Sequence, residues 1–209
     1  MRSHIDHLVV VCEDLSSGID QIEGLFGVRP VIGGRHAAWG THNALIGLGD
    51  RQYLEIIAPD PEALVSPDSR PESFSADRDG LHLKTWAAAL SGLEEACART
   101  AEIGVPLGAL SCGARTRPDG TELQWELSDP ACFVYGGVVP FLIDWGTSPH
   151  PSDHAPPGCN LVTLRLGHPD SARVQEVFDV LGFDRLVYQA DRPTLSAVIE
   201  SPKGRVELH

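Results

Sequence analysis

The sequence predicts an α+β protein in which one βαβββ unit occurs three times. His7 lies in an apolar strand pattern, and Leu15 follows where a helix should begin. His82 and Leu90 repeat this spacing further along the chain. A third apolar run starts with Asn160 in place of the histidine. Internal repetition constrains the architecture more strongly than any single residue does, so the repeat is the basis of the fold prediction.

The first unit shows clear start and stop signals. Its opening strand is apolar and rich in β-branched residues, which is typical of a strand covered on both faces. Asp14 or Ser16 can cap the helix that follows, and Gly27 lies where a helix ends in a left-handed residue. Turn residues separate three further strands. We expect strands at 5–12, 28–36, 42–48 and 52–58.

The second unit repeats this order. Ser91 and Glu94 have the spacing of a capping box that opens a helix, and Gly104 ends it. Asp119-Gly120 supplies a hairpin turn before a strand with clear alternation. We expect strands at 81–86, 107–113, 121–128 and 139–145.

The third unit has the same order of elements in a weaker form. Asp170 or Ser171 caps its helix and Gly182 closes it. Proline-bearing polar segments at 59–80 and 147–158 separate the units and are expected to be connections. The strands of this unit are expected at 160–166, 186–190, 194–200 and 204–208.

Composition excludes several classes of function. The net charge is −13 and the sequence has no basic run, so nucleic acid and anionic membranes are not expected partners. No apolar stretch approaches the ~20 residues that span a bilayer. The sequence passes directly from Met1 into strand pattern, which favours a cytoplasmic protein. The five cysteines are scattered without a Cys-x-x-Cys pair, which is typical of reduced thiols.

A repeated βαβββ unit with His in its first strand and Glu in its fourth resembles the vicinal oxygen chelate superfamily, which includes glyoxalase I, extradiol dioxygenases and bleomycin-resistance proteins. The stretch from Gly33 to Asn43 reads Gly-Gly-x-His-x-x-Trp-Gly-Thr-x-Asn, and Tyr53-Leu54-Glu55 follows it. This stretch is similar to the glyoxalase-like domain proteins.

The resemblance implies a fold. Modules 1–58 and 81–146 would pair, and their sheets would curl into a half-open mixed β-sheet barrel with flanking helices. The chain would then comprise a glyoxalase-like domain over 1–146 and a third, degenerate βαβββ module over 159–209. The third module must cover an apolar sheet face, so we expect it to pack beside the barrel or to pair with its twin in a homodimer.

The resemblance also implies a metal centre. By position, His7 and Glu55 match the ligands of the first module, and His82 matches the first-strand ligand of the second. Asp144 is the carboxylate nearest the fourth ligand position, although a shift of one residue would turn it away. Such ligands suit a divalent Zn, Fe, Mn, Ni or Co ion. Glu55 is also the candidate catalytic residue.

Glu55 stands out on its own chemistry. A carboxylate between apolar residues in a central strand costs free energy unless something compensates it. A divalent ion would do so, and so would an Arg partner or solvent. His7 and His82 carry weight as a pair, because a lone strand histidine is usually structural.

Polar and aromatic side chains lie close together in the sequence where the expected strands at 28–36 and 42–48 meet in a turn. An indole among hydrogen-bonding groups suits the rim of a small-molecule pocket. The alternatives are local backbone bonds for the polar residues and core packing for the indoles. The candidate substrate-binding residues are His36, Trp39, Thr41, Asn43 and Trp125.

Three readings of the function remain from these observations. The first is a metal-dependent lyase, isomerase or dioxygenase that acts on a small oxygen-bearing organic molecule by bidentate chelation, with the ion stabilising an oxyanion. The alternative is a metal-free small-molecule-binding protein of the bleomycin-resistance type, with walls formed by Trp39, Trp125 and Trp145. An inactive structural relative is a third reading.

Overall fold

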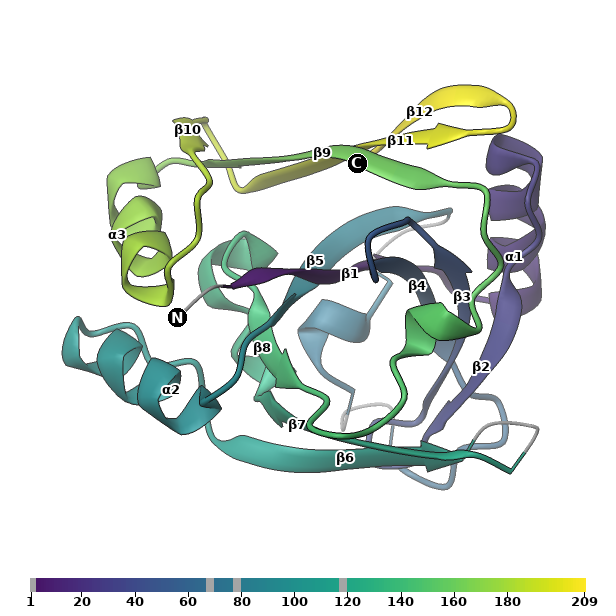
Figure 1. Ribbon diagram of the computed structural model, residues 1–209, viewed down its shortest axis with the longest axis horizontal. Helices are drawn as coiled ribbons and strands as arrows, with labels where there is room; N and C mark the ends of the chain where they lie inside the picture. Colours follow the sequence, from purple (N-terminus) through teal and green to yellow (C-terminus); the bar gives the residue numbers. More distant parts are fainter. Residues whose placement is uncertain (1–2, 67–69, 77–79, 117–119) are drawn as a thin grey trace.

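The first unit folds in the predicted order. The computed structural model describes residues 3–66, 70–76, 80–116 and 120–209 (Figure 1). The side chain of Asp14 caps the first helix, and Gly27 ends it with left-handed backbone at φ 77°. The elements are β1 (His4–Val11), α1 (Leu15–Phe26), β2 (Val31–His36), β3 (Thr41–Gly47) and β4 (Tyr53–Pro59).

The second unit repeats this order, but its helix starts differently. The predicted capping box is wrong: Gly92 is the N-cap residue, at φ 80°, and no side chain caps this end. Glycine adopts this left-handed backbone at little cost, so the N-cap lies one residue after Ser91 and the helix begins at Leu93. The turn predicted at Asp119-Gly120 begins outside the described residues. The elements are β5 (His82–Ala89), α2 (Leu93–Glu102), β6 (Leu110–Thr116), β7 (Glu122–Ser128) and β8 (Phe141–Asp144), with short 3₁₀ turns at Glu72–Phe74, Pro130–Cys132 and Val134–Gly137.

The third unit keeps the element order but pairs its strands differently. Strand β9 lies between β10 and β11 in a four-stranded sheet of order β10-β9-β11-β12, whereas β1 of the first unit pairs with the last strand, β4. Asp170 caps the helix as predicted. None of the described helices is long and apolar enough to cross a membrane. The elements are β9 (Asn160–His168), α3 (Ser171–Leu181), β10 (Val187–Gln189), β11 (Thr194–Ser201) and β12 (Gly204–Leu208).

The first two units join into one curled sheet. Its order is β2-β3-β4-β1-β5-β8-β7-β6, with β1 and β5 antiparallel at the centre. The sheet curls until its edge strands meet, where Arg115 on β6 donates a hydrogen bond to the Gly33 carbonyl on β2. The predicted curled mixed barrel with flanking helices is therefore confirmed, and its seam is nearly closed.

Alternate residues of the central strands serve two cores. Leu8 and Val10 belong to an outer cluster that also includes the buried faces of the helices. Val9 and Val11 face the inside of the barrel. This division follows from the two-residue period of a strand, so one apolar run can build both cores.

The third sheet covers the outside of the barrel. Leu164 and Ile199 join the same outer cluster as Leu8 and Trp86. Figure 1 shows the sheet beside β1 and β5, with α1 at one end and α2 and α3 at the other. The third unit thus packs beside the barrel, which was one of the two expected arrangements. The homodimer and the division into domains stay predictions.

Two glycines of α1 give a matched test of this packing. A Cβ on Gly18 would lie 2.5 Å from Cys12 Sγ, whereas a Cβ on Gly24 would meet nothing within 4 Å. We expect Gly18→Ala to lower the free energy of unfolding by about 1–3 kcal/mol, because the core is overpacked. Gly24→Ala should raise it by about 0.5–1 kcal/mol through helix propensity. Urea unfolding measures both, and equal effects of the two substitutions would contradict the packing described.

Candidate functional site

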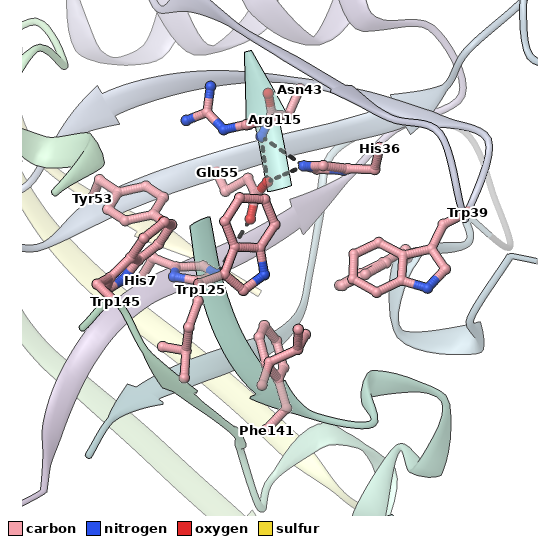
Figure 2. A pocket seen from close by; sticks show the side chains of 13 residues that line it. His7, His36, Trp39, Asn43, Tyr53, Glu55, Arg115, Trp125, Phe141 and Trp145 are labelled. Carbon is pink, nitrogen blue, oxygen red and sulfur yellow. Dashed lines mark hydrogen bonds and ion pairs between the residues drawn. The ribbon is translucent and has the colours of Figure 1, made fainter. Parts of the chain in front are cut away.

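A small cavity lies inside the barrel (Figure 2). Its volume is about 30 Å³, which is room for a group of roughly the size of water. Polar side chains gather on one side of it: His7, His36, Asn43, Glu55 and Arg115. Aromatic side chains form most of the remaining wall: Trp39, Tyr53, Phe74, Trp125, Phe141 and Trp145.

A β-bulge in β1 aims two adjacent side chains into this region. Ile5 pairs with Ala88 of β5 and His7 pairs with Ala87, so Asp6 is an extra residue on its strand. Ile5 and Leu8 both pack in the outer core, which a strand without an extra residue would not allow. The bulge therefore lets Asp6 and His7 face the same side and contact each other, with 2.7 Å between Asp6 Oδ1 and His7 Nδ1.

Glu55 is the centre of the polar contacts. Its Oε2 lies 3.2 Å from His7 Nε2, and its Oε1 lies 3.7 Å from His36 Nε2. Asn43 donates a hydrogen bond from Nδ2 to Oε1. Glu55, His7 and Asn43 are 6%, 3% and 2% exposed, so protein side chains rather than water compensate the carboxylate.

Burial and ion pairing shift the pKa values of the buried His7, Glu55 and Asp6 side chains in opposite directions. Burial alone would lower the pKa of His7, but hydrogen bonds and charges of Asp6 and Glu55 outweigh it and raise this pKa to about 9. Burial alone would raise the pKa of Glu55, but His7, His36 and Asn43 lower it to about 2. Asp6 has its pKa lowered well below the usual range by His150 and His7, against the effect of burial.

His36 experiences the opposite balance. Burial lowers its pKa, and the charge of Glu55 opposes this only in part, while Arg115 and His7 lower it further. Its Nδ1 lies 3.0 Å from Thr41 Oγ1, and its Nε2 lies 3.4 Å from Asn43 Nδ2. The ring is thus fixed at both nitrogens.

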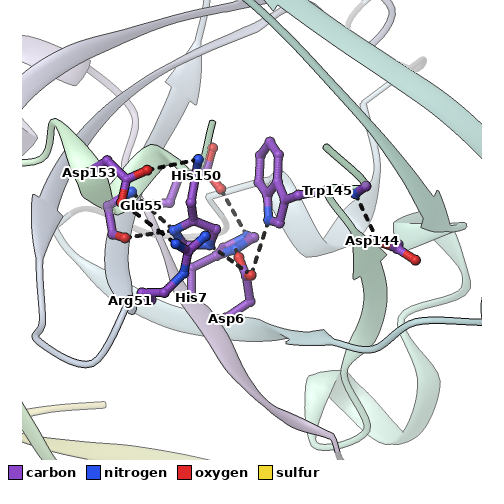
Figure 3. Close-up of polar contacts among 10 residues, drawn as sticks. Asp6, His7, Arg51, Glu55, Asp144, Trp145, His150 and Asp153 are labelled. Atoms are coloured by element: carbon purple, nitrogen blue, oxygen red, sulfur yellow. Dashed lines mark hydrogen bonds and ion pairs between the residues drawn. The ribbon is translucent and has the colours of Figure 1, made fainter. Parts of the chain in front are cut away.

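The second oxygen of Asp6 contacts a different segment (Figure 3). Trp145 Nε1 donates to Asp6 Oδ2 at 3.1 Å, and His150 Nε2 lies 3.0 Å from the same oxygen. His150 precedes a 3₁₀ turn, Pro151–Asp153, in the stretch between β8 and β9. The predicted connection at 147–158 therefore contributes a side chain to the site.

Most of the predicted site residues come together. His7, His36, Trp39, Asn43, Glu55 and Trp125 all line the cavity. Thr41 is buried behind His36 and holds its ring, so its contact with the cavity is indirect.

His82 lies elsewhere. It pairs with Val11 at the far end of β1, while Ala87 pairs with His7. Five residues of strand separate Ala87 from His82, on the order of 15 Å. His7 and His82 each precede a leucine by the same spacing, but this does not bring the two histidines together. The strands β1 and β5 run antiparallel, and bulges shift their register.

Asp144 also lies apart. Its Oδ1 accepts a hydrogen bond from the Gly146 amide, and Figure 3 shows it directed away from Asp6 and His7. It lines a separate hollow with Glu126, its cross-strand partner. The sequence allowed for a shift of one residue that would turn Asp144 away, and the structure shows that shift. Phe141 and Ile143 lie on the cavity face in place of Asp144.

The residues present do not fit a metal centre with four ligands. Within 3–66, 70–76, 80–116 and 120–209, no group of three or more His, Cys, Asp and Glu side chains is placed to hold a metal ion. The second unit presents Ala87 and Phe141 beside His7, and neither can ligate a metal.

Sequence reasoning missed several residues for different reasons. Tyr53 shares a strand face with Glu55, so alternation alone could have identified it. Its ring stacks on His7 at 4.5 Å. Asp6 is hidden because a bulge breaks the alternation. Arg115 and His150 reach the site from strands and turns far along the chain, which no local pattern reports.

One of the solved structures that resemble this chain supports the fold, with a TM-score above 0.5. A hypothetical protein from Staphylococcus aureus matches with a TM-score of 0.62 and 12% identity, covering 99% of this chain and 84% of that one. A methylmalonyl-CoA epimerase from Mycobacterium tuberculosis has a TM-score of 0.43 and 20% identity, covering 68% and 87%. A methylmalonyl-CoA epimerase from Streptomyces coelicolor, in complex with 2-nitronate-propionyl-CoA, has a TM-score of 0.45 and 16% identity, covering 70% and 100%.

The family is shown by sequence. No protein with a curated description matches the chain. A family model described as "Glyoxalase-like domain" matches residues 5–182, which is most of the sequence. That range includes every residue placed around the cavity and extends through α3. The chain therefore belongs to the glyoxalase-like domain family, in the vicinal oxygen chelate superfamily that its sequence resembles.

Proposed function

We propose that this protein catalyses proton transfer on a small carbonyl compound, as an isomerase or lyase does, with His7 and His36 as the reacting groups. One observation carries the proposal. Two imidazoles face a single buried carboxylate, Glu55, in one cavity, and their hydrogen-bond partners require different proton states.

His7 must carry both of its ring protons. Its Nδ1 contacts Asp6 and its Nε2 contacts Glu55, and an ionised carboxylate only accepts hydrogen bonds. Both nitrogens therefore donate, which makes the ring an imidazolium. The raised pKa of His7 agrees with this geometry.

His36 is assigned the neutral form. The Asn43 amide points Nδ2 at both Glu55 and His36, so His36 Nε2 accepts and Nδ1–H donates to Thr41 Oγ1. A neutral imidazole acts as a general base when substrate displaces the Asn43 amide, 3.4 Å away, from the Nε2 lone pair. Two like groups with opposite pKa shifts in one site are the usual sign of an acid–base pair.

The chemistry follows from these states. His36 Nε2 takes a proton from the carbon next to a carbonyl. The electron pair of that C–H bond forms a C=C bond, and the π pair of the carbonyl moves to its oxygen. The positive charge of His7, whose Nε2–H stays on Glu55, stabilises the oxyanion that forms. The proton then returns from His36 to carbon or oxygen, which completes an isomerisation. Aromatic walls keep water out of the reaction.

This assignment gives Glu55 a supporting role. A carboxyl group with a pKa of about 2 is a weak base, and a base works best when its pKa lies near the working pH. Glu55 instead keeps His7 charged and holds the Asn43 amide. The catalytic role predicted for Glu55 thus becomes a positioning role in the proposal.

Metal-free binding is the second candidate, because the wall of the cavity is largely aromatic. In that reading the indoles of Trp39, Trp125 and Trp145 hold an organic ligand by burial and stacking. Either function requires wall side chains to move for a ligand larger than water, which is common on binding.

Deuterium exchange separates the two functions. We expect the protein to exchange the C–H next to the carbonyl of hydroxyacetone, dihydroxyacetone or pyruvate in D₂O, followed by proton NMR. His36→Gln should reduce the exchange rate by about 10²–10⁴-fold. His42→Gln is the matched control, since His42 neighbours the site on β3 without lining the cavity. Binding of these compounds without exchange would favour the binding protein.

The charged array also sets stability against pH. His7→Gln should lower the free energy of unfolding by about 3–5 kcal/mol, because two buried carboxylates lose their cation. In the native protein the His7 contribution is complete below pH 6.5 and is lost as pH rises through about 9. The Glu55 contribution is present above pH 4.5 and is lost as pH falls toward 2. Urea midpoints measured across pH should fall at alkaline pH in the native protein. They should fall likewise in His154→Gln, the control at an exposed histidine, but not in His7→Gln.

The proposed reaction needs no metal. Elemental analysis of untreated protein for Zn, Fe, Mn, Ni and Co is expected to find no stoichiometric ion, because the described part of the second unit, 81–116 and 120–146, contributes no ligand beside His7. One equivalent of an ion that disappears in Glu55→Gln would contradict this and restore the metal-dependent reading.

A further inference from the structure

Asp6 connects two parts of the site. Its Oδ1 holds His7, and its Oδ2 accepts from Trp145 and His150. Trp145 and His150 belong to residues 145–155, which we call the wall segment. Asp6 is 1% exposed, so these contacts are shielded from water.

The wall segment closes one side of the cavity. The Trp145 ring lies against that of Trp125, with 5.2 Å between their centroids. Ala155, at the other end of the segment, packs with Leu45 and Tyr53. Tyr53 in turn stacks on the His7 ring. The segment thus reaches His7 from two directions, through Asp6 and through Tyr53.

The hydrogen bonds have a defined direction. The Ser152 amide donates to His150 Nδ1 at 3.3 Å, so His150 Nε2 carries the proton that Asp6 accepts. His7 and Trp145 donate to Asp6 as well. Asp6 therefore acts purely as an acceptor, and a carboxylate offers enough lone pairs for three donors.

We propose that Asp6 is a positioning residue that couples the orientation of His7 to the docking of the wall segment. His7 is held ready for reaction only while the cavity is closed. The inference builds on the role proposed for His7 and adds to the working site a segment that runs from the end of the second module into the connection after it.

Asp6→Asn tests the coupling, because the amide keeps the shape and loses one acceptor. Its NH₂ group must face either His7 or the wall donors, all of which carry N–H. In ¹⁵N-histidine NMR at neutral pH, we expect the native protein to show an imidazolium pattern for His7 and Asp6→Asn to lose it. Backbone hydrogen exchange in 145–155 should become about tenfold faster, as expected for one lost bond to a charged group.

His150→Gln tests the coupling from the other side. It leaves both carboxylates on His7 in place and releases the wall segment at one contact. We expect faster exchange in 145–155 and a changed ¹⁵N signal of His7. The matched control is Asp14→Asn, the same chemical change at the cap of α1, which should alter neither readout.

Two results would overturn the inference. One is an unchanged His7 signal in His150→Gln despite faster exchange in the wall segment. The other is unchanged exchange in that segment when Asp6→Asn removes the acceptor. Should Asp6→Asn fail to fold, His150→Gln decides alone. Neither readout measures turnover. A substrate screen that finds no activity would therefore reject the proposed reaction and would not bear on the coupling.

Discussion

One buried imidazolium between two carboxylates governs the centre of this structure. His7 is held by Asp6 on one side and Glu55 on the other, and none of the three is more than 6% exposed. Removing any partner would leave a charge without compensation in a medium that penalises it. The strand pairing, the bulge in β1 and the position of Glu55 on β4 all serve this arrangement.

The two paired units contribute unequally to it. The first unit supplies the ionisable groups His7, His36 and Glu55, while the second supplies Trp125, Phe141 and the seam residue Arg115. A fold with internal symmetry thus contains a site without symmetry. The consequence is a one-sided polar cluster facing an aromatic wall, which suits a small ligand with one reactive oxygen-bearing end.

The sequence was informative where local periodicity and burial act together. The helices after Asp14 and Asp170 and the strand containing Glu55 follow from such patterns, and so does the clustering of His36, Trp39 and Asn43 near Glu55. The sequence pattern did not place His82 correctly. The register of β1 against β5 depends on bulges, which form only when these two distant segments pair. The sequence pattern also failed at Ser91, where backbone freedom at Gly92 replaced a side-chain cap. Arg115 and His150 act over long distances in the chain, so no local pattern could indicate them.

The bulge at Asp6 means that the scaffold needs only one extra residue to hold a second carboxylate. Without that residue the pairing of β1 with β5 would be regular as far as Val9, with Ile5 and Leu8 still in the outer core and His7 still directed inward. One added residue therefore brings the carboxylate into the barrel and leaves its neighbours along the strand in place.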